Sequence, residues 1–439
     1  MNRPAELRII WCVVFVMTLA LASPHVVASQ KVVHHFQNTA HGLGWLSWIR
    51  EQIPRFEAQN PDVKIELSVP TTGGTADTFM VFIASGVSLD VSELVLRMAS
   101  SVASQGGYMD LRPFLQRSSK ISFDAYVPIA RTAMTRPNGM IWGIPVDLYV
   151  VPTHYHAEMF ARGGLATPAQ LGTGWNFDAA LTASKRLTID RDGDGIPEEW
   201  GTHNAYTLWV YRNAFENKGA KMFDRDIEPT RSLLNTPKVI EALHWLADLH
   251  LVHNVAHFDS GNYSGEFPKG IYAWSLGTGP NTSQLLAQAN ADFRWGVALP
   301  IGGVKQGSYT AVNSFQIPVT SQNPDAAWRW IEFLTSSQES WQSYIAHTNR
   351  LPANQRFMTQ WLRMIQSMPN PPEAVENYIE AAVHPDNYVD ILSPHYARFE
   401  QIAYPLIRNE VLQGQRDPRA VLEELHQQMN ALFETTQQE

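Results

Sequence analysis

The stretch Lys31–Val69, KVVHHFQNTAHGLGWLSWIREQIPRFEAQNPDVKIELSV, decides the fold class. Its first seven residues are apolar and β-branched enough to form a strand. Apolar side chains then recur at helical spacing, at Leu46, Ile49, Ile53 and Phe56. Asn60-Pro61 ends that helix, and Val63–Val69 alternates between apolar and polar residues as a strand does. A strand, a helix and a second strand in this order predict parallel pairing and an α/β fold.

The same pattern continues along the chain. The segment Met80–Leu96, MVFIASGVSLDVSELVL, predicts an apolar helix that ends at Gly86 and a buried strand over Asp90–Leu96. Three later helices begin with a capping residue followed by proline, at Thr236-Pro237, Asn323-Pro324 and Asp417-Pro418. No low-complexity linker or solenoid repeat is present, so we expect short connections between domains.

Composition narrows the functional classes. The hydrophobic fraction of 44% and charged fraction of 17% are ordinary for a globular protein, and 439 residues suffice for two or three domain-sized units. The formal charge of −9 and the absence of any run of Lys or Arg argue against nucleic-acid binding. Aromatic residues reach 11%, which suits flat apolar ligand faces such as sugar rings.

The N-terminus has the pattern of a secretory signal peptide. Arg3 and Arg8 precede an apolar run over Ile9–Ala22, and Val27-Ala28-Ser29 offers small residues for cleavage near residue 29. The run is short for a membrane span, although a retained anchor is an alternative. The single cysteine, Cys12, lies inside this run, so the exported chain would lack disulfides and thiolate metal sites. We therefore expect a periplasmic or extracellular protein, with residues 1–29 removed.

The acidic stretch Asp190–Gly201, DRDGDGIPEEWG, resembles the start of a calcium loop. Carboxylates at alternating positions, a glycine at position 6 and a main-chain carbonyl at position 7 can converge on one cation. Position 12, where a bidentate Glu is usual, is Gly201. The candidate calcium ligands are therefore Asp190, Asp192, Asp194, Ile196, Glu198 and Glu199. The alternative is a hydrated acidic turn; a catalytic acid pair is disfavoured because glycosidase carboxylates face each other across a sugar.

Other chemical motifs are absent or weak. The sequence has no G-x-S-x-G, no P-loop and no dinucleotide fingerprint. His154 and His156 alternate on a predicted strand, and His253 and His257 have helical spacing, but neither pair has an apparent third metal ligand. We therefore predict no catalytic residues, and calcium as the one candidate cofactor.

Several segments in the same order resemble the family 1 extracellular solute-binding proteins of ABC importers, the group that includes maltodextrin-binding proteins. The similar segments include FEAQNPDVKIELSV, GGYMDLRPFL, NGMIWGIPVDLYVVPTHYHAEMFARGGL, the acidic loop with the helix before it, WGVALPIGG and GQRDPRAVLEELHQQMN. Three positions depart from the family: Leu89 replaces a usual proline, and His156-Ala157 replaces Asn-Lys. No single segment is specific, but together they cover nearly all of the chain after the leader.

The resemblance implies a two-lobed periplasmic-binding-protein fold of type II, in which each lobe is a mixed sheet flanked by helices and the ligand cleft lies between the lobes. We expect crossings near Pro145, Pro300 and Ser393. Lobe one would hold residues 30–144 and 302–392, and lobe two residues 145–301 and 393–439. Closure of the lobes about a hinge would trap the solute.

Candidate ligand residues lie on loops at strand ends, where open α/β sheets bind ligands. Aromatic faces, amides and carboxylates suit a sugar, although burial in the core is the alternative for any one tryptophan. The candidates are Asn38, Thr39, His41, Glu93, Arg97, Asp147, Tyr149, Tyr206, Trp209, Trp274 and Asn281. Trp209 and Trp274 are the leading aromatic candidates, because each adjoins glycine or polar loop residues.

The resemblance implies a binding protein rather than an enzyme. It would capture a mono- or oligosaccharide as a monomer and deliver it to the transmembrane subunits of an ABC permease. Two alternatives remain open at this point: a secreted glycosidase or lyase, and a binding protein for a non-sugar solute such as a polyamine, an iron complex or a phosphodiester.

Overall fold

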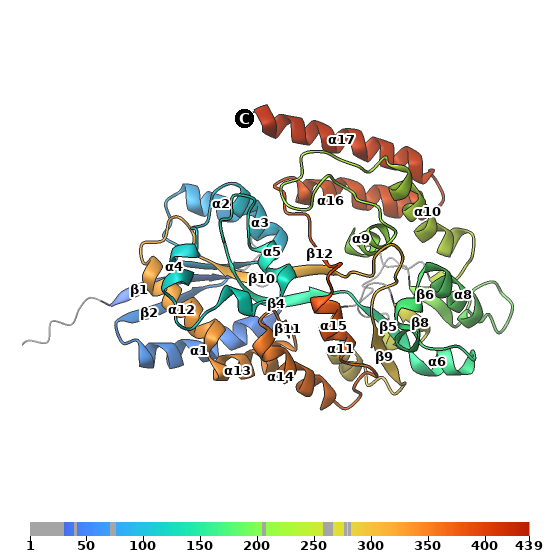
Figure 1. The fold of residues 1–439 in the computed structure, drawn as a ribbon, viewed down its shortest axis with the longest axis horizontal. Coiled ribbons are helices and arrows are strands. Elements are labelled where there is room, and N and C mark those ends of the chain that lie inside the picture. Colours follow the sequence, from blue (N-terminus) through green and yellow to red (C-terminus); the bar gives the residue numbers. More distant parts are fainter. Residues whose placement is uncertain are drawn as a thin grey trace, which may run out of the picture.

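Two mixed β-sheets flanked by helices make up the protein (Figure 1). The computed structural model describes residues 30–38, 42–70, 76–203, 208–257, 267–275, 279 and 282–438, with backbone only at 76–78, 208–209, 283–284 and 436–438. We call each sheet with its own helices a lobe. The predicted α/β two-lobed fold is confirmed.

The first sheet has the strand order β11-β4-β10-β3-β1-β2, with β12 pairing with β10. Pairing of β1 with β2 and β3 is parallel, whereas β10 runs antiparallel to β3 and β4. Its strands are β1 (Lys31–Gln37), β2 (Val63–Ser68), β3 (Val91–Leu94), β4 (Ile144–Val150), β10 (Tyr309–Gln316), β11 (Leu351–Pro352) and β12 (Tyr388–Val389).

Helices cover both faces of this sheet (Figure 1). Helices α2, α3 and α5 lie on one face, and α1, α13 and α14 lie on the other. The helices of the first lobe are α1 (Leu43–Gln59), α2 (Ala76–Ala84), α3 (Leu96–Ser104), α4 (Arg112–Arg117), α5 (Pro128–Ala133), α12 (Pro324–Ser336), α13 (Gln338–Thr348) and α14 (Gln355–Gln366), with a 3-10 turn, η1 (Phe123–Ala125).

The second sheet has the order β7-β6-β8-β5-β9 and is also mixed. Its strands are β5 (Thr153–His156), β6 (Trp200–His203), β7 (Ala256–His257), β8 (Tyr272–Ser275) and β9 (Trp295–Ala298). Its helical elements are α6 (Ala157–Arg162), α7 (Pro168–Leu171), η2 (Gly172–Gly174), α8 (Phe177–Leu187), α9 (Leu208–Asn217), α10 (Pro237–Leu251), η4 (Phe267–Lys269), α11 (Thr282–Gln288), α16 (Tyr396–Pro405), the π-helical η5 (Leu406–Val411) and α17 (Pro418–Gln438).

The predicted β-α-β unit is β1, α1 and β2, and it forms for the expected reason. Trp45, Trp48, Ile49 and Phe56 on one face of α1 are buried against the sheet, and Asn60 follows the last turn. The three predicted Pro-initiated helices are α10, α12 and α17. Of their capping residues, Thr236 and Asn323 make no side-chain capping bond.

The two lobes share buried apolar residues. One core fills the first lobe and continues beneath α15 (Asn377–Val383) to Trp295 and Tyr272 of the second sheet. A second core packs the other face of that sheet against α8, α9, α10, α16 and α17. Helix α15 contacts both β4 and β9. The lobes are thus joined by packing as well as by the chain crossings.

The first crossing differs from the prediction. We expected the chain to leave the first lobe near Pro145, but β4 pairs with β10 through Val150, and the crossing is Val151-Pro152. Pro145 is tolerated in a strand because it pairs with Ser314 beside a break in the ladder register. The other crossings lie between Ala298 and Tyr309, and between Val389 and Tyr396.

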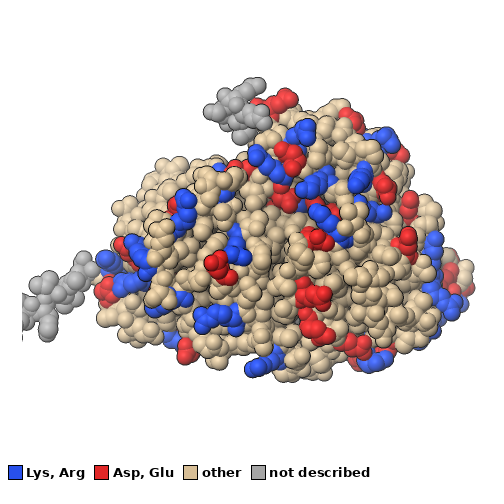
Figure 2. Space-filling view, viewed as in Figure 1, with Lys and Arg blue, Asp and Glu red and all other residues tan. Residues whose placement is uncertain are grey.

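No described helix combines the length and the apolar character needed to span a membrane. The predicted signal peptide, residues 1–29, lies outside the described residues. On the face shown in Figure 2, positive and negative side chains are interspersed rather than gathered into a patch of one sign.

Candidate functional site

A cluster of polar side chains lies where the two lobes meet. We call it the junction cluster: Arg97 of α3, Tyr309 of β10, Asp390 after β12, and Tyr396 and Glu400 of α16. The Tyr309 hydroxyl donates to Asp390 Oδ2 at 2.8 Å. Arg97 NH1 lies 3.6 Å from Glu400 Oε2. The cluster therefore combines two carboxylates, one guanidinium and two phenols from both lobes.

Burial sets the electrostatics of this cluster. Asp390 is 4% exposed, and burial raises its pKa, although Arg212 and the Tyr309 hydroxyl act in the opposite direction. Burial also raises the pKa of Glu400 to about 7, with Arg97 opposing and Asp390 adding to the shift. Hydroxyl donors, carboxylate acceptors and aromatic rings together are the groups that recognise sugar hydroxyls and ring faces.

Helix α9 ties this region to the second lobe. Arg212 is 1% exposed; its NH1 donates to the Val389 carbonyl at 2.6 Å and its NH2 to Asp226 Oδ1 at 2.9 Å. Asn213 accepts from the backbone N–H of Tyr309 at 2.8 Å and donates to the Val151 carbonyl at 3.2 Å. All three crossings are therefore bonded to one helix, which fixes their relative positions.

Two of the predicted ligand residues lie together at the ends of β1 and β3. The backbone N–H of Asn38 donates to the Glu93 carbonyl at 3.2 Å, and Gln37 Nε2 donates to Glu93 Oε2 at 2.7 Å. Both predicted residues are buried, Asn38 at 1% and Glu93 at 0% exposure. The carboxyl ends of neighbouring parallel strands bring them together.

Asp147 lies deeper than a contact residue on an open surface would. Its carboxylate, which is fully buried, accepts from Trp45 Nε1 at 3.2 Å, from Asn313 Nδ2 at 2.6 Å and from the Tyr344 hydroxyl. Arg350 NH1 lies 3.7 Å away. These partners come from α1, β10, α13 and the segment after it, so Asp147 holds the first lobe together.

Tyr149 brings the two lobes into contact. A Cβ atom on Gly279 would lie 2.4 Å from the Tyr149 ring, so only glycine allows this close approach. Tyr149 is on β4 of the first sheet, whereas Gly279 follows β8 of the second. Of the remaining candidates, Thr39, His41, Tyr206 and Asn281 lie outside the described residues, and the side chain of Trp209 is not described.

The structure corrects the prediction that Trp274 is a ligand residue. Its side chain is 0% exposed in the core of the second lobe, where its indole N–H donates to Ser184 Oγ at 2.9 Å. Its ring meets Trp175 edge-on at 5.5 Å. The reason is that β8 is an inner strand of the second sheet, and Trp274 faces the helices on that side. The glycine and polar residues that follow it belong to the next loop and do not expose the ring.

Sequence reasoning missed most of the junction cluster. Asp390, Tyr396 and Glu400 lie in NYVDILSPHYARFE, where a carboxylate between apolar residues and closely spaced aromatic and acidic residues offered a weak signal. Tyr309 opens β10 and looked like an ordinary strand residue. Only Arg97 was among the candidates.

The acidic loop brings its aspartates together. Carboxylate oxygens of Asp190, Asp192 and Asp194 lie within 4.8 Å of one another, and all three residues are exposed. Asp190 accepts from the backbone N–H groups of Gly193 and Gly195, at 2.8 and 3.0 Å. This arrangement of hard oxygen donors fits a calcium ion.

The glutamates of the loop are partly engaged elsewhere. Glu199 pairs with Arg191 and with Arg162, the latter at 2.6 Å, whereas Glu198 Oε2 accepts from the backbone N–H of Arg191 at 2.8 Å. Glu199 is therefore poorly placed to close the coordination sphere, because two guanidinium groups already share its charge. His253 and His257 do not share a helix: α10 ends at Leu251, and His257 is on β7.

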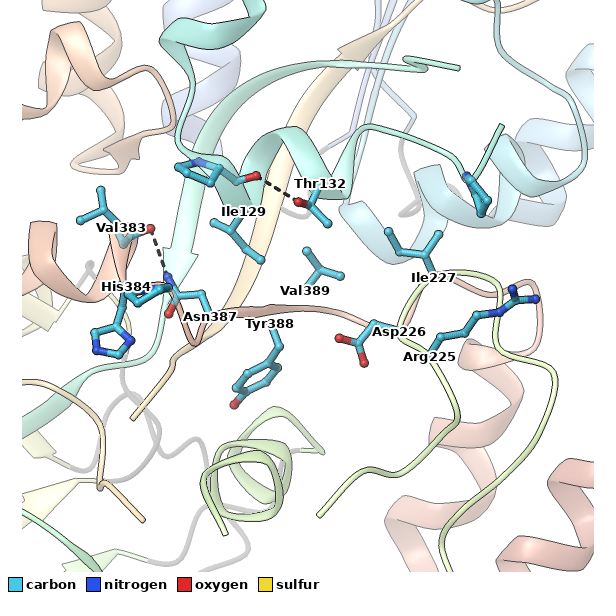
Figure 3. A pocket seen from close by; sticks show the side chains of 14 residues that line it. Ile129, Thr132, Arg225, Asp226, Ile227, Val383, His384, Asn387, Tyr388 and Val389 are labelled. Carbon is cyan, nitrogen blue, oxygen red and sulfur yellow. Dashed lines mark hydrogen bonds between the residues drawn. The ribbon is translucent and has the colours of Figure 1, made fainter. Parts of the chain in front are cut away.

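A separate cavity of about 790 Å³ lies between the lobes beside α5. Ile129, Ile227, Val383 and Val389 surround the space, and Asp226 lies at one end (Figure 3). Helix α5 covers the face of the first sheet opposite to α1, which contacts Asp147. The cavity therefore lies on the other side of the sheet from Asp147.

Solved structures confirm the fold. An ABC substrate-binding protein from Listeria monocytogenes, solved with cycloalternan, has a TM-score of 0.74 and 21% identity, covering 92% of this chain and 99% of that one. UspC of M. tuberculosis has a TM-score of 0.75 and 21% identity, covering 91% of this chain and 99% of UspC. A cyclic alpha-maltosyl-1,6-maltose binding protein from Arthrobacter globiformis has a TM-score of 0.72 and 18% identity, covering 92% of this chain and 100% of that one.

Sequence comparison identifies the family. No curated relative matches the chain. The sequence model of the bacterial extracellular solute-binding proteins matches residues 42–340, which include strands of both sheets and two of the three crossings. The chain therefore belongs to the bacterial extracellular solute-binding protein family.

Proposed function

We propose that this protein is the exported substrate-binding component of an ABC importer and captures a mono- or oligosaccharide between its lobes. The observation that carries the proposal is the junction cluster, because its phenols, carboxylates and guanidinium come from both lobes. A solute bound there would contact both lobes at once, and closure would enclose it.

The sugar assignment draws on the neighbours. Similar proteins have been solved with cycloalternan, alpha-D-tagatose or maltose, and another is a cyclic alpha-maltosyl-1,6-maltose binding protein. Because these structures are at most 21% identical to this chain, they do not select among sugars. The family is one of binding proteins rather than enzymes, so the protein would act with separate permease subunits, as a monomer, after removal of residues 1–29.

A thermal-shift screen of the exported protein tests the proposal. Maltose, maltotriose, cyclic oligosaccharides and common monosaccharides would be compared with spermidine and ferric citrate. A ligand at 100 times its Kd stabilises the native state by about 2.7 kcal/mol, which gives a readily measured rise in midpoint. A rise with a polyamine or iron complex and with no sugar would contradict the substrate class, and turnover of a glycan would favour an enzyme.

We also propose that the acidic loop holds a structural calcium ion, through Asp190, Asp192, Asp194 and the Ile196 carbonyl. Glu198 is the candidate to complete the set, because two arginines engage Glu199. The 4.8 Å spacing of the three carboxylates supports this. Calcium should raise the thermal midpoint and EDTA should lower it. The double variant Asp192→Asn, Asp194→Asn should abolish the difference. An unchanged midpoint in the unmodified protein would leave the loop as a hydrated turn.

A further inference from the structure

One ion pair of the junction cluster spans the two lobes. Arg97 is on α3, which packs against α2 and β10 of the first lobe, whereas Glu400 is on α16, which packs against α17 of the second. The Arg97 side chain is 41% exposed and that of Glu400 is 23% exposed. Rotation of the lobes apart would therefore separate the pair and expose Glu400 to water.

The charges that act on Glu400 are one guanidinium, Arg97, and one carboxylate, Asp390. Arg97 faces it from α3, Asp390 from the segment after β12, and Tyr309 and Tyr396 from β10 and α16. Arg212 of α9 acts on Asp390, and its own closest partners are Asp226 and the Val389 carbonyl. At Glu400, burial therefore outweighs the attraction of the partly exposed Arg97, and the carboxylate of Asp390 acts in the same direction as burial.

We propose that Glu400 couples closure of the two lobes to proton uptake, so that the closed state is favoured as pH falls through neutrality. Glu400 is then a positioning residue: its protonation state determines how readily α16 docks against Arg97 and the first lobe. This inference rests on the lobe closure that the proposed function requires, but not on the identity of the solute.

The direction follows from the electrostatics. With the lobes together, burial raises the pKa of Glu400 to about 7, from an ordinary value of 4.5. With the lobes apart, the carboxyl would be hydrated and its pKa would return toward the ordinary value. The closed state therefore binds a proton that the open state releases, and closure is favoured most below pH 4.5. That advantage is lost as pH rises to about 7.

The test measures closure without a solute. Fluorophores at Ser119→Cys in the first lobe and Lys185→Cys in the second, both exposed, would report the distance between lobes in protein with Cys12→Ser. From pH 5.5 to 8, we expect the ratio of closed to open protein to fall roughly tenfold, less than the full shift allows because Glu400 is partly exposed.

Three variants give the test its specificity. Glu400→Gln should remain closed at pH 8 with a flat profile, because it mimics the protonated acid. Glu400→Asp should keep a ratio of closed to open protein that depends on pH, because it retains a carboxyl group. A role for Glu400 in packing alone would not require that dependence. Glu410→Gln is the matched control, since Glu410 pairs with Arg416 inside the second lobe. Its profile should follow that of the unmodified protein.

Two results would overturn the inference: a flat profile in the unmodified protein, or a Glu400→Gln profile that still follows it. Either can be told apart from failure of the proposed function. A protein that binds no sugar, yet closes with the expected pH dependence, would refute the sugar assignment and leave the role of Glu400 intact.

Discussion

An ion pair between Arg136 and Glu228 should stabilise the contact between the lobes on the side of the α5 cavity. Arg136 follows α5 in the first lobe, and its Nε and NH2 both donate to Glu228 Oε1, the former at 2.8 Å. Arg136 NH1 also donates to the Ala103 carbonyl at 2.5 Å. Glu228 belongs to the loop between α9 and α10, whose backbone pairs with Leu392. The pair therefore joins α3, the segment after α5 and the third crossing.

The size of the effect can be worked from exposure and geometry. The Arg136 and Glu228 side chains are 21% and 31% exposed, so water screens the pair only in part. A hydrogen bond to a charged group contributes about 1.5–3 kcal/mol, whereas an exposed ion pair contributes about 0–1. We expect an intermediate coupling free energy of about 1–2 kcal/mol.

Backbone conformation distinguishes the variants at Glu228. Its φ of 52° lies in the left-handed region, which costs a non-glycine residue about 1 kcal/mol. Glu228→Gln removes the charge and keeps that cost, so it should destabilise by about 1–2 kcal/mol. Glu228→Gly also removes the charge but relieves the backbone, so its loss should be smaller by up to about 1 kcal/mol.

The assay is a double-mutant cycle of Arg136→Gln and Glu228→Gln, with free energies of unfolding from urea titrations followed by tryptophan fluorescence. The matched control is Arg131 with Asp124, a pair inside the first lobe whose aspartate is 88% exposed. Its coupling should stay within the surface range. The reasoning is refuted if the Arg136 and Glu228 effects add without coupling, or if Glu228→Gly destabilises more than Glu228→Gln.

Three further predictions follow from burial. Trp274→Ala should lower the free energy of unfolding by about 3–5 kcal/mol, measured in urea, and a change in solute affinity without this loss would restore Trp274 as a ligand residue. Asp147→Ala should lower the free energy of unfolding by about 3–5 kcal/mol in the same assay, because it leaves buried donors of Trp45, Asn313 and Tyr344 without their acceptor. A decrease below about 1 kcal/mol would contradict this. Burial lowers the pKa of His154 from its ordinary value of 6.5 to about 3. Between pH 6.5 and pH 3 the unfolded chain therefore binds a proton that the folded chain does not, so the free energy of unfolding should decrease as the pH is lowered through this range. His154→Gln should reduce the slope of the free energy of unfolding against pH by about one proton, or about 1.4 kcal/mol per pH unit. An unchanged slope between pH 7 and pH 5 would show that His154 is not the source of this pH dependence.

Local pattern predicted the elements well, because each depends on residues that are neighbours in the chain. The helical spacing of Leu46, Ile49 and Phe56 and the alternation after Val63 reappear as α1 and β2. The resemblance placed the first crossing near Pro145, whereas β4 continues past Pro145 through a register shift that leaves Val146 without a partner on β10. That pairing involves a strand more than 160 residues away, so no local pattern contained it.

The candidate site was harder to predict because it depends on contacts between distant segments. Glu93 and Asn38 meet because neighbouring parallel strands end at one edge of the sheet, although Glu93 is a buried residue of β3 rather than a loop residue. Trp274 was assigned from the polar residues after it, but strand position, not chain neighbours, determines which face a side chain occupies. The junction cluster joins Arg97 and Glu400, which are some three hundred residues apart in sequence.

By itself, the sequence determined the α/β class, the order of the elements and the resemblance to solute-binding proteins, because periodicity and chain order carry that information. It also placed three aspartates on one tight loop, whose short length brings their carboxylates together. Only the tertiary structure decided that Trp274 packs in a core, that Asp147 anchors the first lobe and that Glu400 faces Arg97 across the lobes. The physical reason is that burial and charge pairing depend on every segment that surrounds a side chain, and those segments meet only when the chain is folded.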